Sequence, residues 1–217
     1  MTTCVYSANF GGFDNPTIHE PQVGENVALS LFNDFNFPSR QHAMHPRLRA
    51  RLPKIFGAEL LPGYDRYIWL DASLRLSRPD SVAWFLSQLG DGDIAVFLHP
   101  SRATIHEEAD YLRTKLKAGS YYIRARYEGE DLDGQMREIE ADPVYEDQHL
   151  YASGAFCFRP CSAIREAMKE WWYHTSRFHC IDQLAFPYVL RHCDVRRINE
   201  DIYHASHLEW TKHKLNA

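Results

Sequence analysis

The sequence predicts an α/β fold, with a mostly parallel central sheet and helices on both of its faces. Short apolar segments suited to strands alternate with longer segments of helical spacing, an order typical of parallel sheets. The chain has 217 residues, of which 45% are hydrophobic, and this suffices for one core of ordinary size. No repeat, low-complexity tract or Pro/Gly/Ser linker interrupts it, so we expect residues 1–217 to form a single domain.

The first elements expected along the chain are two strands and a helix. Residues 3–8, "TCVYSA", have the β-branched and aromatic content of a strand, and the following "NFGGFDNP" has the composition of a loop. Residues 27–32, "VALSLF", predict a second strand. Residues 45–57 begin as a helix because Pro46 suits the first helical position, whereas Pro53 should kink or break that helix.

The central part of the chain predicts strands at 67–71 and 93–100 and helices at 78–92 and 104–119. The first of these strands, "YIWLD", is apolar but ends on a carboxylate, and the second, "DIAVFLHP", ends on a histidine and a proline. The helix 78–92 has polar capping residues at its start and a glycine at its end. The helix 104–119 begins with Thr104 followed by glutamate three residues later, which is the capping-box pattern.

The C-terminal part begins with a polar stretch, 120–146, that fits either a frayed helix pair or a mobile flap. Residues 151–160, "YASGAFCFRP", predict a strand whose internal glycine allows the close approach of a ligand or of another backbone. Helices are expected at 161–177 and 180–192, followed by a short strand at 194–199 and a histidine-rich tail.

Composition and charge narrow the classes of function. A net charge of -5 and a pI near 6.2 argue against mainly electrostatic binding of nucleic acid, so no nucleic-acid partner is expected. The start "MTTCVYSANF" does not resemble a signal peptide, and no stretch of about 18 apolar residues predicts a membrane span. The five cysteines include no CxxC pair, which indicates reduced core residues and a cytoplasmic protein. The GxSxG, P-loop, GxGxxG and HExxH signatures are absent from the sequence.

Polar side chains follow several of the expected strands, at the edge where the carboxyl ends of parallel strands meet. In α/β sheets, ligands bind at that edge. A single residue of this kind is more often a turn or capping residue than a ligand, but its recurrence on several strands favours a site. The residues concerned are Ser7, Asn9, Asp34, Asp71, Ser73 and His99.

Several stretches, taken as a set, resemble a known family. They are "VYSANFGGFD", "LFND", "RARLPKIF" and "YDRYIWLDASLRL", continued by "FLHPSRATIHEEADYL", "SGAFCFR" and "HCIDQLAFPYVL". The set is similar to the TOD1/MUCI70 glycosyltransferase-like family and, more distantly, to GT-A nucleotide-sugar transferases of the glycogenin-like kind. This resemblance implies a GT-A-like, Rossmann-like domain. It also implies transfer of a sugar from a nucleoside-diphosphate sugar to a hydroxyl acceptor, with surface polysaccharide as one acceptor class.

The resemblance assigns Asp71 to a site for metal and diphosphate. GT-A enzymes carry an Asp-x-Asp at this strand end, and its carboxylates hold a divalent metal, Mn or Mg, that stabilises the departing diphosphate. Here the motif reads "DAS", so Asp71 matches the first acid while Ser73, a poor ligand beside a carboxylate, replaces the second. A late histidine completes the metal site in glycogenin-like enzymes. The candidates here are His204 and His207, whose spacing of three places them on one helical face or in one turn, and for which a surface or packing role is the alternative.

The resemblance also implies contacts with the donor. The cations Arg47, Arg51 and Lys54 would pair with phosphate oxygens and do part of the work of the metal, unless they form a solvated helix face. The nucleotide-binding positions that it assigns are Ser7, Ala8, Asn9, Phe10 and Asp34, and those facing the donor sugar are His99 and Arg102.

Asp182, at the start of an apolar helix, has two interpretations. It caps that helix, or it acts as the general base that deprotonates the acceptor hydroxyl in an inverting enzyme. Two other functions remain open for the chain. A degenerate transferase would bind a nucleotide-sugar without turnover, which Ser73 favours. A metal-dependent hydrolase would use Asp71, Asp182 and His204, since one plant member of the resembling family is described as a ceramidase.

Overall fold

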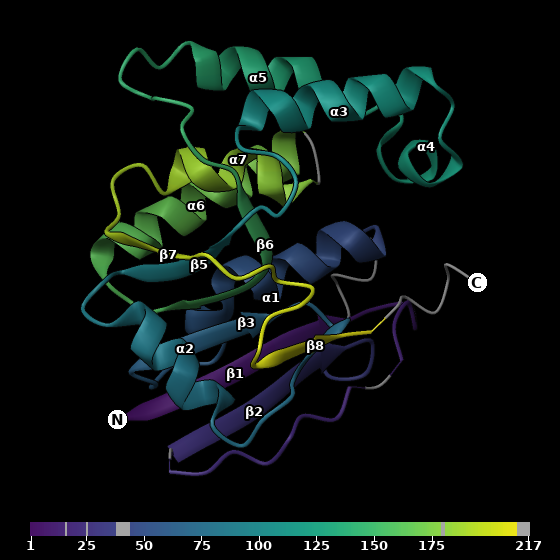
Figure 1. Ribbon diagram of the computed structural model, residues 1–217. Coiled ribbons are helices and arrows are strands. Elements are labelled where there is room, and N and C mark those ends of the chain that lie inside the picture. The colour runs from purple at the N-terminus through teal and green to yellow at the C-terminus, as the bar shows by residue number, and fades with distance from the viewer. Residues whose placement is uncertain (16, 25, 38–43, 179–180, 212–217) are drawn as a thin grey trace.

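A six-stranded sheet forms the centre of the computed structural model, which describes residues 1–15, 17–24, 26–37, 44–178 and 181–211 (Figure 1). The strand order is β2-β1-β3-β6-β5-β7, and only β6 runs antiparallel to its neighbours. The prediction of a mostly parallel α/β sheet is therefore confirmed. The strands are β1 (Thr2–Asn9), β2 (Asn26–Asn33), β3 (Arg66–Leu70), β5 (Ile94–Leu98), β6 (Tyr151–Phe158) and β7 (Val195–Ile198).

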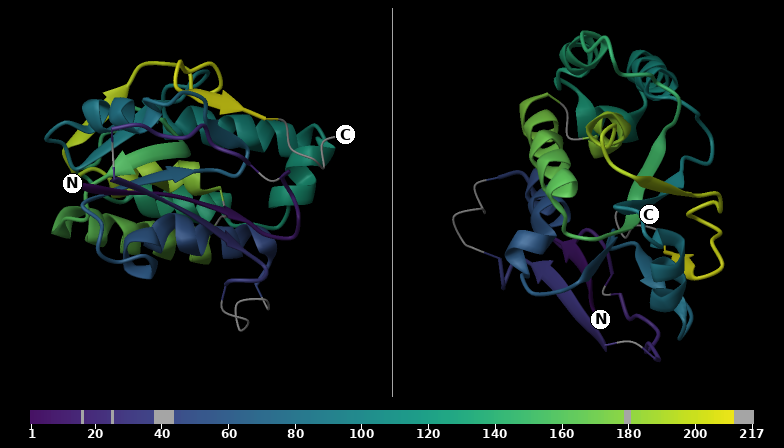
Figure 2. Two further views of the ribbon diagram at one scale, coloured as in Figure 1. Left: turned by 90° about the horizontal axis from the view of Figure 1, so that it is seen from below. Right: turned by 90° about the vertical axis from the view of Figure 1, so that its left-hand side faces the viewer.

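Helices cover both faces of this sheet, as the two views of Figure 2 show. The helices α1 (Pro46–Leu60), α6 (Ser162–Arg177) and α7 (Asp182–Val189) pack on one face, in a core that includes Tyr6 and Trp69. The opposite face packs against α2 (Ser81–Leu89). The inner strands β1, β3, β5 and β6 are buried on both sides, so they read as continuous apolar runs rather than as alternating patterns.

The undecided stretch 120–146 contains two helices. They are α4 (Tyr121–Tyr127) and α5 (Leu132–Glu140), which follow α3 (Ile105–Lys117) along the chain and lie with it at one end of the molecule (Figure 1). The predicted cap of α3 is present, since the Thr104 side chain accepts a hydrogen bond from the Glu107 backbone N–H at 3.2 Å. Of the two alternatives left open for this stretch, the helix pair is the one observed.

Two short strands were not predicted from the sequence. They are β4 (Leu74–Leu76) and β8 (Leu208–Trp210), which pair antiparallel and cover the α2 face of the sheet. The helix expected at 180–192 is observed as α7, and residue 180 lies outside the described residues. The helix expected at 45–57 is interrupted as predicted, although the non-helical backbone is at Phe56 rather than at Pro53 itself.

The approach of α1 to the sheet depends on one small residue. A Cβ atom at Gly57 would lie 2.2 Å from the ring of Tyr6 on β1, so only glycine fits at this position. The Tyr6 hydroxyl in turn donates a hydrogen bond to the Lys54 carbonyl at 3.1 Å. These two contacts set the height of α1 above the sheet, and α1 carries the basic residues that the sequence assigned to the site.

No helix within the described ranges is both long enough and apolar enough to cross a membrane.

Candidate functional site

A pocket of about 360 Å³ opens at the carboxyl ends of β1 and β3. The loop after β1, the first half of α1, the residues after β3 and the end of α4 contribute to its walls. The parallel strands thus bring the polar strand ends to one edge of the sheet, as the sequence predicted. The expected donor-binding residues that line this pocket are Ala8, Asn9, Phe10, Arg47, Arg51, Asp71 and Ser73.

Two of the other expected residues lie beside this pocket. Ser7 faces a neighbouring pocket of about 320 Å³ because successive side chains of a strand point to opposite faces of the sheet. Asp34 accepts hydrogen bonds from the Gly11 backbone N–H at 2.7 Å and from the Arg49 guanidinium at 2.5 Å. The Asp34 carboxylate therefore holds the loop after β1 in place.

The carboxylate that ends β3 is held by a buried lysine. The Lys54 side chain is 1% exposed, and its Nζ lies 3.1 Å from Asp71 Oδ1 and 2.6 Å from Asp182 Oδ2. Lys54 Nζ also donates to the Ser153 hydroxyl at 3.4 Å, and the Trp69 indole N–H donates to Asp71 Oδ1 at 2.8 Å. We call Lys54, Asp71 and Asp182 the Lys54 cluster. A buried ammonium requires such partners, which explains why an apolar strand ends on an acid.

Asp182 contributes to this cluster from the first turn of α7, where its side chain is 6% exposed. Burial alone would raise the pKa of this carboxyl, but the cations of Arg51 and Lys54 hold its pKa below the usual range. Arg51 Nε lies 3.4 Å from Asp182 Oδ2. The N-cap position of α7 is occupied by Ile181, and Asp182 is the first residue of the helix. A carboxylate that is paired in this way is a weak base, so its geometry favours a role in positioning Lys54.

Further residues of the pocket lining that the sequence did not assign to the site include Phe13, His45, Arg126 and Tyr127. The Arg126 guanidinium lies 5.1 Å from the ring centroid of Phe13 and 4.1 Å from that of Tyr122. Arg47 donates from its guanidinium to the carbonyls of Arg126, at 2.7 Å, and of Ala125, at 3.2 Å. The signal in the sequence was "RARY" at 124–127, a basic and aromatic run inside the stretch that the sequence left undecided.

His99 and Arg102 lie after β5, farther along the same sheet edge, and do not line this pocket. His99 Nδ1 faces the backbone N–H groups of Ser101, at 3.2 Å, and Arg102, at 3.0 Å. Burial and the nearby Arg102 lower the pKa of His99 to about 4, so the ring is neutral near pH 7. The Arg102 guanidinium forms an ion pair with the buried Glu108. Contact of this pair with a donor sugar stays a prediction.

The structure does not bring His204 and His207 to Asp71. His204 Nδ1 lies 2.9 Å from Asp201 Oδ2, and the His204 side chain is 82% exposed. The His207 ring stacks on Trp84 with a centroid separation of 4.9 Å. The two histidines fall in successive turns before β8 rather than on one helical face, so their spacing of three does not bring them together.

The residues around Asp71 do not fit a divalent metal. Ser73 supplies a hydroxyl where a second acid was expected, and the Lys54 ammonium already contacts the Asp71 carboxylate. Across the described part of the chain, no three histidine, cysteine or acidic side chains form a group suited to a metal ion. The metal set expected from the resemblance, Asp71 with His204 and His207, is therefore not assembled in this structure.

Three solved structures illustrate what the chain is similar to. A glycosyltransferase involved in the glycosylation of the major capsid of PBCV-1 is 12% identical with a TM-score of 0.46, over 95% of this chain and 85% of that chain. The WbbM bifunctional glycosyltransferase is 11% identical with a TM-score of 0.49, over 91% of this chain and 38% of that chain. The galactosyltransferase LgtC is 12% identical with a TM-score of 0.43, over 90% and 73%. No curated protein matches the chain.

The family model of the TOD1/MUCI70 glycosyltransferase-like domain matches residues 39–209. This range begins after β2 and includes α1, β3, α4 and α7, which carry the Lys54 cluster and most of the pocket wall. The loop after β1, which supplies Phe10 and Phe13, lies outside the matched range. The chain therefore belongs to the TOD1/MUCI70 family of glycosyltransferase-like domains.

Proposed function

We propose that the protein is a glycosyltransferase that moves a sugar from a nucleoside-diphosphate sugar to a hydroxyl acceptor. The observation that carries this proposal is the pocket at the ends of β1 and β3, where Arg47, Arg126 and Asp71 line one chamber together with aromatic rings. A nucleoside diphosphate combines an aromatic base with a strongly anionic group, and this chamber offers complementary groups for both. Membership of a glycosyltransferase-like family supports the same reaction class.

The aromatic part of the pocket suits the nucleoside. Phe10, Phe13 and Tyr127 line it, and the Arg126 guanidinium lies over the Phe13 ring. Stacking of a base against such rings is tolerant of base identity, with gains of about 1–3 kcal/mol per base in proteins that bind single strands. The proposal therefore places the base on the α4 side of the pocket.

The cations of the pocket suit the diphosphate. Arg47 and Arg126 make their contacts with neutral groups, namely carbonyls, a tyrosine hydroxyl and aromatic rings. An arginine bound to neutral partners keeps its full charge for an anion, and its planar fork matches phosphate oxygens. In the transfer step the acceptor oxygen bonds to the anomeric carbon while the bond from that carbon to the phosphate oxygen breaks. The leaving diphosphate takes the electron pair, the proton of the acceptor hydroxyl is released to solvent in the overall reaction, and the arginines stabilise the charge of the diphosphate.

Asp71 has a separate part in this proposal. Its Oδ1 is occupied by Trp69 and Lys54, and a donor hydroxyl would donate its hydrogen bond to Oδ2. Asp182 lies behind it in the Lys54 cluster and acts by positioning. The acceptor class that we retain from the resemblance is a glycan such as a surface polysaccharide.

Of the two rival functions, the structure gives the hydrolase less support. That mechanism needs Asp71, Asp182 and His204 around one metal, whereas His204 is paired with Asp201 and largely exposed to solvent. The degenerate binding protein shares the pocket and differs only in turnover, so kinetics must separate it from the transferase.

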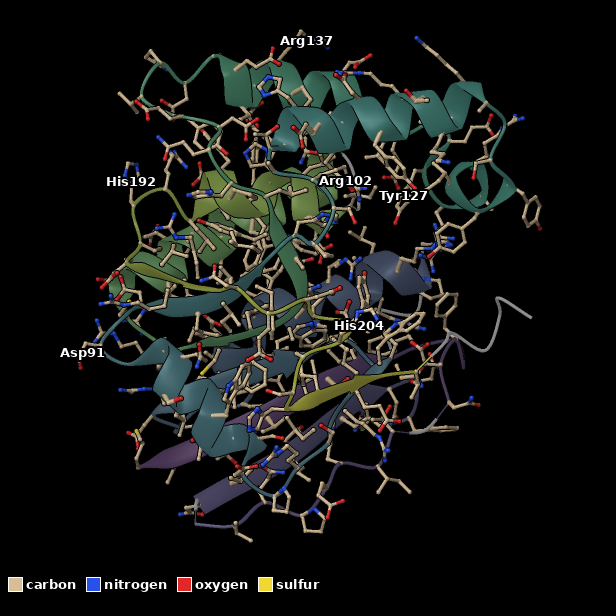
Figure 3. All side chains as sticks on the ribbon, in the orientation of Figure 1. Asp91, Arg102, Tyr127, Arg137, His192 and His204 are labelled. Carbon is tan, nitrogen blue, oxygen red and sulfur yellow. The ribbon has the colours of Figure 1, made fainter. Side chains whose placement is uncertain are left out.

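The test measures donor binding and turnover separately. Calorimetric titration with UDP-, GDP-, CMP- and dTDP-sugars identifies the donor, and release of its nucleotide, which is CMP for a CMP-sugar and a nucleoside diphosphate for the others, reports turnover with and without added glycans. Arg126→Ala should weaken binding of the identified donor. Arg137→Ala is the matched control, because this exposed arginine on α5 does not line the pocket and lies at the top edge of the view in Figure 3, above Tyr127.

Binding of one donor that needs Arg126, together with acceptor-dependent release of diphosphate, supports the transferase. Binding without any release supports the degenerate protein, and absence of binding to all donors contradicts the proposed function.

A further inference from the structure

We infer that the buried ammonium of Lys54 takes the place of a divalent metal beside Asp71, so that the nucleotide-sugar donor binds and reacts without one. The inference rests on the proposed function and specifies how the same site balances its charges. Lys54 acts here as a positioning residue, because it lies behind the pocket and does not line it.

The first step of the argument is geometric. Lys54 Nζ lies 3.1 Å from Asp71 Oδ1 and 2.6 Å from Asp182 Oδ2, so one cation bridges two carboxylates as a metal would. The indole rings of Trp69 and Trp171 lie on either side, with centroids 5.6 Å and 5.9 Å from Nζ. The ammonium is thus enclosed by two acids and two aromatic rings.

The backbone of Lys54 is also anchored. Its carbonyl accepts a hydrogen bond from the Tyr6 hydroxyl, and the adjacent turn of α1 is pressed against Tyr6 at Gly57. The side chain is 1% exposed, so a swing into solvent would require α1 to leave the sheet. Lys54 therefore does not vacate the position when a metal is offered.

The second step is electrostatic. A hard divalent cation bound to Asp71 Oδ1 would sit about 2.0–2.6 Å from that oxygen, and hence within about 6 Å of the Lys54 ammonium. The Lys54 ammonium is buried and the Asp71 carboxylate is 37% exposed, so solvent screens this pair of cations only in part and the ammonium repels the metal. Asp71 Oδ1 is also engaged by the Trp69 indole N–H, which leaves it less able to serve as a ligand.

The third step compares charges. Among these four side chains, the positive Lys54 and Arg51 balance the negative Asp71 and Asp182, and a divalent metal would leave an excess of two positive charges. The negative charge of a bound diphosphate instead meets Arg47 and Arg126 on the pocket wall. The serine at position 73 fits this arrangement, since a second acid would upset the balance.

The primary experiment uses the unmodified protein. Electron paramagnetic resonance titration with Mn²⁺ should show no saturable site, and the Kd of the donor should agree within about twofold in EDTA and in Mn²⁺. One saturable Mn²⁺ per chain, together with a donor affinity at least tenfold higher in Mn²⁺, would overturn the inference.

A variant tests the substitution directly. Lys54→Met leaves Asp71 and Asp182 without their shared cation, and a saturable Mn²⁺ site should appear, then disappear in Lys54→Met/Asp71→Asn. Lys54→Arg should behave as the unmodified protein does. Lys169→Met, at an exposed lysine on α6, is the matched control and should gain no Mn²⁺ site.

The outcomes also separate this inference from the proposed function. If Lys54→Met fails to fold, the Mn²⁺ and donor titrations of the unmodified protein still decide whether the site works without a metal. A folded Lys54→Met that gains no Mn²⁺ site contradicts the substitution of metal by ammonium. Donor binding that requires Mn²⁺ contradicts the inference of a metal-free site but remains consistent with the proposed transferase function. Absence of binding to any donor, in EDTA or in Mn²⁺, rejects the transferase and with it a metal-free donor site.

Discussion

The two halves of the carboxyl edge of the sheet differ in the partners of some of their arginines. Arg49 and Arg51 of the β1 and β3 half form ion pairs with Asp34 and Asp182, but two further arginines of that half have other partners. In the β1 and β3 half, Arg47 and Arg126 bind carbonyls, a hydroxyl and aromatic rings, and both line a pocket. In the β5 and β7 half, Arg102 is neutralised by Glu108, and His204 is paired with Asp201. Charges that are matched by carboxylates stabilise local structure, whereas charges bound to neutral groups remain available to an anion. This contrast is why we place the donor in the first half.

The largest effect is expected from removing the acid at the centre of the first half. Asp71→Ala should lower the rate of sugar transfer by at least about 100-fold, in the range seen when a single stabilising group is removed from an active site. Circular dichroism should show an intact fold, since Lys54 keeps Asp182 as its partner. Asp110→Ala, at an exposed acid on α3, is the control. Transfer at the unmodified rate would show that Asp71 has no role in the reaction.

A comparison of two arginines tests the contrast itself. Arg126→Ala should raise the donor Kd about tenfold, equivalent to the loss of about 1.4 kcal/mol, because it removes a cation that faces the pocket. Arg102→Ala should leave the donor Kd within about twofold of the unmodified value, because the Arg102 charge is neutralised by its ion pair with Glu108. Calorimetric titration measures both values. Equal losses in the two variants would break the distinction between the halves.

The packing of α1 against β1, which supports the first half of the site, can be tested by the melting temperature of variants. Gly57→Ala should lower the melting temperature by about 2–12 °C, since overpacking costs about 1–3 kcal/mol and each kcal/mol shifts the melting temperature of a domain of this size by about 2–4 °C. The clash is with the ring of Tyr6. Tyr6→Phe, which keeps the ring but loses the hydrogen bond to Lys54, should cost only about 1 kcal/mol. A Gly57→Ala protein that melts normally would mean that α1 sits farther from β1.

The smallest effect expected is a difference in pH dependence. His99 has a folded pKa of about 4, below its unfolded value of about 6.5, so the folded state excludes a proton that the unfolded chain binds. The contribution of the neutral His99 ring to the free energy of unfolding is therefore fully present above pH 6.5. This contribution is lost as the pH falls towards 4. The pKa of Asp182 is lowered below the ordinary aspartate value of about 3.9. The contribution of the Lys54 cluster to the free energy of unfolding is therefore present above pH 3.9 and is lost only at more acidic pH.

His99→Gln should accordingly flatten the fall of melting temperature between pH 6.5 and 4, whereas Asp182→Asn should change stability with little effect on that slope. Thermal melts across this range measure both. An unchanged slope in His99→Gln would assign the pH dependence to other histidines.

The architecture and the edge of the site could be predicted from the sequence because they depend on local patterns. Apolar runs such as "YIWLD" mark buried strands, and their polar ends must meet where parallel strands end. The partner of Asp71 could not be predicted, because Lys54 reaches it only through the close packing of α1 on Tyr6. Asp182 joins them from a helix more than a hundred residues later in the chain.

Other features escaped prediction for reasons of length. The strands β4 and β8 have three residues each, too few for a pattern of alternation to be recognised. Arg126 lies in the seven-residue helix α4, inside a polar stretch whose composition favours no single structure. The histidine spacing of three predicted one helical face or one turn, whereas the chain makes two successive turns before β8.

The way in which α1 binds α4 has a consequence for the evolution of this site. Arg47 holds α4 by the carbonyls of Ala125 and Arg126, which are main-chain atoms that every amino acid possesses. Substitutions at positions 126 and 127 can therefore alter the wall that faces the ligand without releasing the helix. Relatives that keep Arg47 could differ in the sequence of this short segment. Their preferences for different donors would then depend on residues of α4 rather than on residues of the sheet.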